Sequence, residues 1–326
     1  MNGLSKILIV SSLLLIAFYA EALTISTDNL VLSPSPAYPK ANSEFIIKAK
    51  TFSFDATRAR FTWYLDGKKI DEGTGLTEQT FVARKLGSKM NIRAAVLSAD
   101  GEYFEDSITI SVSDIDLIIS PLTYTPPFYR GAPLASPGSV VEIIAIPHLY
   151  SGSARINPQS LIYEWSLNNK PVQNQSGGGK NILSLKLADV SNSEQVVTLK
   201  ASTVSGNTSV ERNVRVRTYQ PEILFYETNS VTGKKVKASS FFNFTPASSF
   251  SILAEPFYMA LESLLKSKFT WFVNGNIFSE NAKNPLVLDL TAPPDSESQT
   301  NFSLKIEDVG TLFQRVSGIL TVRITK

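Results

Sequence analysis

Three carboxylates lie close together in the sequence, at Asp66, Asp71 and Glu72, and side chains of this type are the ones that bind calcium in proteins. A calcium ion takes about six or more oxygen ligands that converge on one point. Two or three acids around one turn fall short of that number, and no acidic loop of this pattern recurs later in the chain. We therefore favour a solvated polar turn and predict no metal site.

Two further features suggest catalysis or nucleotide binding. The stretch Ser176–Lys180 is rich in glycine, but a P-loop needs Gly-x-x-x-x-Gly-Lys-Ser/Thr before a helix, and a strand is predicted here at 182–187. His148 is the single histidine, and no Ser-His-Asp, His-Glu-x-x-His or paired-carboxylate pattern accompanies it. We predict no catalytic residue, no cofactor and no enzyme activity. Scattered acids that meet in space as a glycosidase pair are the alternative that the sequence leaves open.

One loop combines aromatic residues with two adjacent prolines: Tyr124, Pro126, Pro127, Phe128 and Tyr129. If the rings are exposed, they form an apolar patch for a partner. The alternative is that the loop packs across the junction between the first and second of three predicted domains and stiffens it, and we favour this alternative. The same question arises for 241–244, where we favour packing of an edge strand or loop.

The three tryptophans occupy one repeated pattern, in which an aromatic residue, Trp and Leu or Val alternate and a polar turn follows. The copies are Phe61–Gly67, Tyr163–Asn169 and Phe269–Gly275. Exposed indoles could stack on a ligand. Alternate residues of a strand share one face, however, so each Trp lies on the same side as the two apolar residues that flank it. We therefore predict that Trp63, Trp165 and Trp271 are structural core residues.

These tryptophans are 102 and 106 residues apart, and the last apolar strand of each copy recurs every 106 residues, at Ile110, Val216 and Val322. A period near 100 residues with alternating strands indicates tandem β-sandwiches. We predict domains at 23–113, 114–219 and 220–326. The joins at 114–119 and 221–226 are short and strand-like, so we expect a fairly stiff rod.

Most of the chain shows the alternation of half-buried strands. We predict strands at 45–50, 91–97, 107–112, 140–146, 182–187, 194–201, 209–216, 251–254, 301–306 and 318–324. One segment, 257–266, has apolar residues at helical spacing and is predicted as a short surface helix. Ser176–Lys180 is predicted as a flexible loop.

Composition excludes several classes of protein. Of the 326 residues, 43% are hydrophobic and 18% charged, and the net charge is only +2, without a basic stripe. Nucleic-acid binding through the phosphate backbone is therefore poorly supported. The absence of cysteine excludes disulfides, thiolate metal sites and thiol nucleophiles.

The N-terminus has the pattern of a targeting segment. Lys6 precedes an apolar run at 7–20, and Ala20-Glu21-Ala22 matches a small-x-small cleavage pattern before Leu23. The run is short for a membrane span, so we favour a cleaved signal peptide at 1–22 over an uncleaved anchor. We expect an exported protein that is periplasmic, at the cell surface or extracellular, with membrane contact only through an uncleaved segment.

Residues 45–112 carry the clearest resemblance to a known family. The phrase Phe61–Gly67, the Ala99-Asp100-Gly101 turn and the closing strand 108–112 are similar to bacterial immunoglobulin-like and PKD-like domains. The resemblance implies an all-β array of three tandem immunoglobulin-like sandwiches. It also implies a non-catalytic spacer or protein-binding module of the cell envelope, with other envelope proteins as partners. The alternatives are an adhesin or glycan-binding protein, and an assembly component of a pilus or S-layer.

Overall fold

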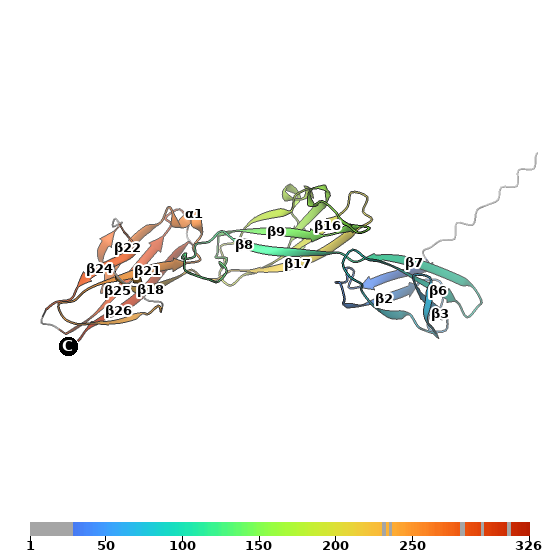
Figure 1. Cartoon of the computed structure of the whole chain (residues 1–326), viewed down its shortest axis with the longest axis horizontal. Coiled ribbons are helices and arrows are strands. Elements are labelled where there is room, and N and C mark those ends of the chain that lie inside the picture. The colour runs from blue at the N-terminus through green and yellow to red at the C-terminus, as the bar shows by residue number, and fades with distance from the viewer. Residues whose placement is uncertain (1–28, 230–232, 235–236, 281–283, 295–296, 312–313) are drawn as a thin grey trace, which may run out of the picture. The chain divides into compact units, whose positions relative to one another are not determined.

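The computed structural model describes residues 29–229, 233–234, 237–280, 284–294, 297–311 and 314–326, which are built almost entirely of β-strands (Figure 1). The backbone forms two compact units. The described part of unit 1 is 29–33, 47–79 and 91–108, and unit 2 contains the described parts of 34–46, 80–90 and 109–326. The predicted targeting segment, 1–22, lies outside the described residues.

The strands around Trp63 form two sheets, which we call the first sandwich. One sheet has the order β1-β2-β5, with β1 at Leu30–Ser35, β2 at Glu44–Thr51 and β5 at Glu78–Val82. The other has the order β4-β3-β6-β7, with β3 at Arg60–Leu65, β4 at Lys68–Thr74, β6 at Lys89–Leu97 and β7 at Tyr103–Ser111.

The second sandwich lies within unit 2. One sheet has the order β15-β9-β8, with β8 at Asp114–Pro121, β9 at Val140–His148 and β15 at Ile182–Lys186. The other has the order β13-β12-β16-β17, with β12 at Ile162–Leu167, β13 at Lys170–Pro171, β16 at Glu194–Ser202 and β17 at Ser209–Arg217. Shorter elements complete it: β10 at Tyr150–Ser151, β11 at Ala154–Arg155, β14 at Gly177–Gly178, and 3-10 turns at Pro158–Ser160 and Gln173–Gln175.

The third sandwich also lies within unit 2. Its first sheet has the order β19-β18-β21-β24, with β18 at Glu222–Asn229, β19 at Gly233–Lys234, β21 at Ser249–Phe257 and β24 at Val287–Thr291. Its second has the order β20-β26-β25-β22-β23, with β20 at Phe241–Phe244, β22 at Lys268–Val273, β23 at Asn276–Glu280, β25 at Ser298–Glu307 and β26 at Arg315–Ile324. The short helix α1 spans Leu261–Leu264.

The order of the strands is that of an immunoglobulin-like sandwich. In each copy the first, second and fifth principal strands share one sheet, and the third, sixth and seventh share the other. The all-β, tandem immunoglobulin-like class predicted from the sequence is therefore confirmed. β8 begins at Asp114 and β18 at Glu222, next to the boundaries expected at 113 and 219. The division into the three stated domains remains a prediction.

The repeated Trp pattern is explained by a hairpin turn whose two central residues both need a positive φ. The angles are 48° and 79° at Asp66 and Gly67, 49° and 64° at Asn168 and Asn169, and 48° and 85° at Asn274 and Gly275. Only Gly, Asn and Asp adopt such turns readily. The first turn residue also caps a neighbouring strand, because its side-chain oxygen accepts the backbone N–H of Asn91, Val196 or Asn301 respectively.

Each tryptophan is almost completely buried, with exposed fractions of 0%, 1% and 2% for Trp63, Trp165 and Trp271. Each indole Nε1 donates a 2.9 Å hydrogen bond to a backbone carbonyl further along the chain, that of Leu76, Lys180 or Pro285. The polar edge of the ring is therefore satisfied inside a core, and no indole face is available to a ligand.

Two predictions of local structure were correct only in part. The helix expected at 257–266 is restricted to α1, because β21 continues to Phe257 and Tyr258 has a left-handed φ of 66°. The loop expected at 176–180 contains β14, whose Gly177 and Gly178 pair with β12. Among the described residues, no helix is long and apolar enough to cross a membrane.

Candidate functional site

The aromatic loop 122–131 is docked on the third sandwich. The N–H of Tyr124 donates to the carbonyl of Met259 at 2.7 Å, and the N–H of Tyr258 donates to the carbonyl of Tyr124 at 2.7 Å. Thr123 pairs with Ala260 in the adjoining antiparallel bridge. We predicted that this loop packs between the first and second domains. That prediction is wrong, because the segment that the loop contacts belongs to the third sandwich. This main-chain pairing joins the second and third sandwiches instead.

The rings of this loop meet aromatic residues of the third sandwich. Phe128 packs edge-on against Tyr226 with centroids 5.4 Å apart, and Tyr129 packs edge-on against Phe257 at the same distance. The hydroxyl of Tyr258 donates to that of Tyr129 at 3.1 Å, and burial raises the pKa of Tyr258. The second sandwich is thus held to the third by ring contacts as well as by backbone bonds.

Side-chain exposure varies along this loop. Pro126 is buried and Pro127 exposed, while Phe128 and Tyr129 keep 37% and 36% of their surfaces open. The hydroxyl of Tyr124 is 3.3 Å from the carboxylate of the buried Glu255, and burial, followed by this carboxylate, raises the tyrosine pKa. The five residues predicted as a partner-binding or junction loop therefore contribute mainly to the junction, with two half-exposed rings at its rim.

Gln314 links the two sandwiches from the interior and had no signal in the sequence. Its side chain is 2% exposed. Its Oε1 accepts the backbone N–H of Ala260 at 2.8 Å, and its Nε2 donates to the hydroxyl of Ser136 at 3.1 Å and to the carbonyl of Pro137 at 2.5 Å. A single glutamine therefore satisfies three polar groups where the two sandwiches meet, and buried groups of this kind are costly to leave unpaired.

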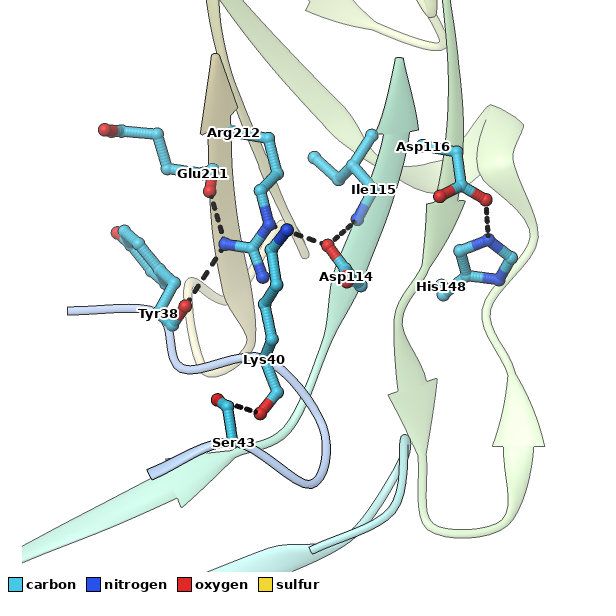
Figure 2. A network of polar contacts seen from close by, with 9 residues as sticks. All are labelled: Tyr38, Lys40, Ser43, Asp114, Ile115, Asp116, His148, Glu211 and Arg212. Atoms are coloured by element: carbon cyan, nitrogen blue, oxygen red, sulfur yellow. Dashed lines mark hydrogen bonds and ion pairs between the residues drawn. The ribbon is translucent and has the colours of Figure 1, made fainter. Parts of the chain in front are cut away.

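A second docked segment, 34–46, lies within unit 2 and is held by Arg212 of β17 (Figure 2). The Nη1 of Arg212 donates to the carbonyl of Tyr38 at 3.1 Å, and its Nε donates to Asp114 of β8 at 2.7 Å. Tyr38 also packs against the core of the second sandwich. Arg212 alternates in phase with Val210, Val214 and Val216, and an arginine at an inward position is the sequence signal for such an ion pair.

His148 has a partner that the sequence did not indicate. Figure 2 shows its ring beside Asp116 of β8, and the Nε2–Oδ2 distance is 2.9 Å. The pair lies on the outer face of the sheet, with Asp116 largely exposed.

The acidic residues after the first Trp strand have local roles. Asp66 accepts from the N–H of Asn91, Asp71 accepts from the N–H of Glu72, and Glu72 pairs with Arg60 and Lys69. In the described parts of the chain, no group of three or more acidic or histidine residues is arranged to hold a metal ion.

The glycine-rich stretch supports the Trp165 strand. The hydroxyl of Ser176 accepts from the N–H of Trp165 at 2.9 Å and donates to the carbonyl of Val172 at 2.8 Å. The ammonium group of Lys180 donates to the carbonyl of Asn174. These groups face the protein's own backbone, so the stretch acts as a structural clamp.

The outer strand β15 of the second sandwich is shielded from pairing with other proteins. Gln175 caps the outer strand β15, because its side chain bonds both the carbonyl and the N–H of Ser184, at 2.8 and 2.7 Å. Natural sheets use such devices against edge-to-edge association, so at this edge we expect binding to involve the sheet faces.

The outer face of the β4-β3-β6-β7 sheet, in unit 1, carries an ordered polar and aromatic network. Arg93 stacks over the ring of Tyr64 at 4.1 Å and donates to Glu105 at 2.9 Å, and Tyr103 donates to the same oxygen at 2.8 Å. The hydrogen bond from Tyr103, followed by that from Arg93, lowers the pKa of Glu105. Tyr103 keeps 61% of its surface exposed.

The chain was compared with protein-family models, curated proteins and solved structures. No protein-family model matches it, and no curated protein matches it. Solved structures that resemble it include the three N-terminal domains of the Highly Immunogenic Outer Capsid protein of bacteriophage RB49, with 11% identity over 91% of this chain and 98% of that one, at a TM-score of 0.27.

Two further arrays show the same degree of likeness. The central fibronectin-III array of RIM-binding protein shares 10% identity over 91% of this chain and 96% of that one, at a TM-score of 0.31. The Bacteroides ovatus protein SGBP-B, solved with a mixed-linkage heptasaccharide, shares 15% identity over 87% of this chain and 64% of that one, at a TM-score of 0.23. The chain's own strand order describes it as a tandem array of immunoglobulin-like β-sandwiches.

Proposed function

We propose that the chain is an exported, non-catalytic structural and interaction protein of the bacterial cell envelope, whose coupled sandwiches hold binding surfaces at a set spacing. The observation that carries the proposal is the docking of the loop 122–131 on the third sandwich. Main-chain pairing at Tyr124, aromatic packing at Phe128 and Tyr129, and the buried Gln314 together resist bending between the second and third sandwiches. The apolar N-terminal segment, 1–22, supports export.

The carboxylates of the cleft beside this junction support a non-catalytic role. The cleft has a volume of about 460 Å³ and is lined by Glu262, Lys266 and Asp308, among others. Glu262 pairs with Lys266 at 2.6 Å, and this bond lowers its pKa. Asp308 accepts the N–H of Gly310, which lowers its pKa as well. A glycosidase needs one carboxyl group with a raised pKa as its acid, and neither group fits that role.

Replacing Gln314 by leucine is expected to loosen the two sandwiches while each stays folded. The N–H of Ala260 and the carbonyl of Pro137 lose their partner, at a cost of about 2–4 kcal/mol to the docked state. Because the chain has no cysteine, two single cysteines at Val204 and Asn276 would carry spin labels uniquely. We expect a narrow label-to-label distance distribution in the parent and a clearly broader one in Gln314→Leu.

The matched control is Gln299→Leu, an exposed glutamine on β25 of the same sandwich. This variant should keep the narrow distribution, because its side chain is open to solvent. Equally broad distributions in the parent and in Gln314→Leu would contradict the spacer function.

A second candidate function, binding of a neutral glycan, is favoured by the network around Tyr103. Aromatic faces stack on the C–H groups of sugars, and charged planar groups bond to neighbouring hydroxyls. Arg93 and Glu105 neutralise one another, so this face suits an uncharged ligand rather than a polyanion. Their mutual bonds also hold the side chains in place before binding, which reduces the entropy lost on association.

Tyr103→Ala is expected to weaken binding to a neutral polysaccharide about tenfold or more, as loss of a central tyrosine does at binding sites. Affinity electrophoresis against a panel of soluble glucans, xylans and mannans measures the change. Phe52→Ala removes another strongly exposed aromatic residue and should leave binding unchanged. Absence of retardation by every polysaccharide in the panel would remove this candidate.

A further inference from the structure

The sheet β15-β9-β8 of the second sandwich presents an apolar outer face, which we call the isoleucine face. Ile118, Ile144 and Ile182 lie directly opposite one another across the three strands, and Ile146 is the next outward residue of β9. Ile118, Ile146 and Ile182 are 46%, 37% and 47% exposed. The alternate residues of these strands fill the core, so these four side chains point away from it.

The polar residues around the isoleucine face are mainly acidic. Asp116 lies opposite Ile146, and Glu142 lies opposite Ser120 on one side and Ser184 on the other. Lys186 is the one lysine on the outward positions of these three strands. An apolar row that crosses a whole sheet, with charges around it, is the arrangement of an interaction surface rather than of a solvated one.

The third sandwich presents a comparable surface on the sheet β20-β26-β25-β22-β23, which we call the basic face. Ile277, Phe272, Ser303 and Ile319 form one row across four strands. Phe241 lies opposite Thr321, the next outward residue after Ile319. Ile277, Ile319 and Phe241 are 62%, 66% and 44% exposed. This row crosses one more strand than the row of the isoleucine face, and it includes one polar residue, Ser303.

The charges around the basic face have the opposite sign. Lys268, Lys305, Arg315 and Arg323 occupy outward positions on the described parts of its strands, and two acids share these positions, Glu307 on β25 and Glu280 opposite Thr270. Glu307 is already paired with Lys305 at 2.6 Å. The two faces therefore match in both respects that an interface requires, an apolar centre and a complementary charged rim.

We infer that the isoleucine face of one copy of the chain binds the basic face of a second copy. The inference rests on the proposed structural function, and the partner that it identifies is a second copy of the same chain. Two sheets pack face to face at about 10 Å with interdigitated side chains, as the two sheets of a sandwich do. Because the faces differ, the contact is heterologous, and each added copy leaves one face of each kind open for growth.

The size of the isoleucine face sets the strength of the contact. The three strands are eight, nine and five residues long, and at about 3.3 Å per residue and about 4.8 Å between strands they give a face of roughly 350 Å². A stable interface takes about 800 Å² from each partner. The association is therefore weak, with a dissociation constant on the order of 10–100 µM. Local concentration at a surface would promote it.

Sedimentation velocity of the full chain over about 2–200 µM tests the inference in the concentration range of such a constant. The weight-average mass should rise with concentration beyond that of a dimer. Ile118→Asp and Ile319→Asp, each purified alone, should remain monomeric. An equimolar mixture of the two should form dimers that do not grow, because each variant keeps one intact face and the free ends carry the altered ones.

Val204→Asp, at an exposed position of the second sandwich outside either face, should associate as the parent does. Ile182→Asp and Ile277→Asp repeat the test at other points of the two rows, and an unchanged melting temperature confirms that each variant is folded. A mass independent of concentration, association of Ile118→Asp or Ile319→Asp alone, or a mixture that stays monomeric would each overturn the inference. Those results would leave the spin-label distances untouched, so failure of the self-association is separable from failure of the spacer function.

Discussion

Replacing Trp63 by alanine is expected to lower the unfolding free energy of the first sandwich by about 3–5 kcal/mol. The ring is completely buried, and its removal leaves a cavity and an unpaired carbonyl at Leu76. A domain of about 100 residues has only about 5–15 kcal/mol of stability in total. Its melting transition should therefore fall by about 15–30 °C, measured by differential scanning calorimetry.

Phe52→Ala is the matched control, since this ring belongs to the same part of the chain and is 72% exposed. It should shift the transition by only a few degrees. Trp63→Phe keeps most of the side-chain volume but loses the indole N–H, so its melting temperature should lie between those of Trp63→Ala and Phe52→Ala. If Trp63→Ala melts like Phe52→Ala, the ring does not stabilise the core and its place in the fold is misunderstood.

Replacing Arg212 by methionine is expected to cost unit 2 about 2–3 kcal/mol. Removing one member of a buried ion pair leaves the other charge without compensation, and the usual cost of about 3–5 kcal/mol is reduced here because Asp114 is 25% exposed. The carbonyl of Tyr38 also loses its donor. Amide hydrogen exchange in 34–46 should accelerate, and the denaturant midpoint of unit 2 should fall.

Arg215→Met supplies the control on the same strand, because Arg215 is 67% exposed and its pair with Glu194 lies at the surface. It should change the free energy of unfolding by less than about 0.5 kcal/mol, with a correspondingly small shift of the midpoint. The double variant Asp114→Leu with Arg212→Met removes both charges and should be more stable than the sum of the single changes predicts. Strict additivity would argue that Arg212 and Asp114 do not act as a pair.

Local sequence signals were sufficient for many of the strands and for the three repeated turns. The alternation in 209–216 identified β17, and that in 140–146 identified β9, to within two residues. Asp66-Gly67, Asn168-Asn169 and Asn274-Gly275 encode turns because these residue types tolerate positive φ at both positions. These properties depend on a few neighbouring residues, so they can be seen in a single sequence.

The errors arose where contacts between distant segments override local preference. Residues 257–260 have a helical pattern, but Tyr258 and Met259 exchange backbone bonds with Tyr124, more than 130 residues earlier. This pairing keeps the segment extended before α1. The same contact explains why the aromatic loop joins the third sandwich rather than the first, since its partner cannot be read from its own composition.

The sequence by itself determined the class of fold, the period of about 100 residues and the place of the tryptophans in the cores. Each of these follows from the alternation of apolar and polar residues within single strands. Only the tertiary structure decided which side chains couple the sandwiches. Gln314 and Gln175 are ordinary polar residues in the sequence, and each becomes important through a partner brought close by folding. The two apolar faces follow the same rule, because a row such as Ile118, Ile144 and Ile182 exists only once strand order and register align three separate segments.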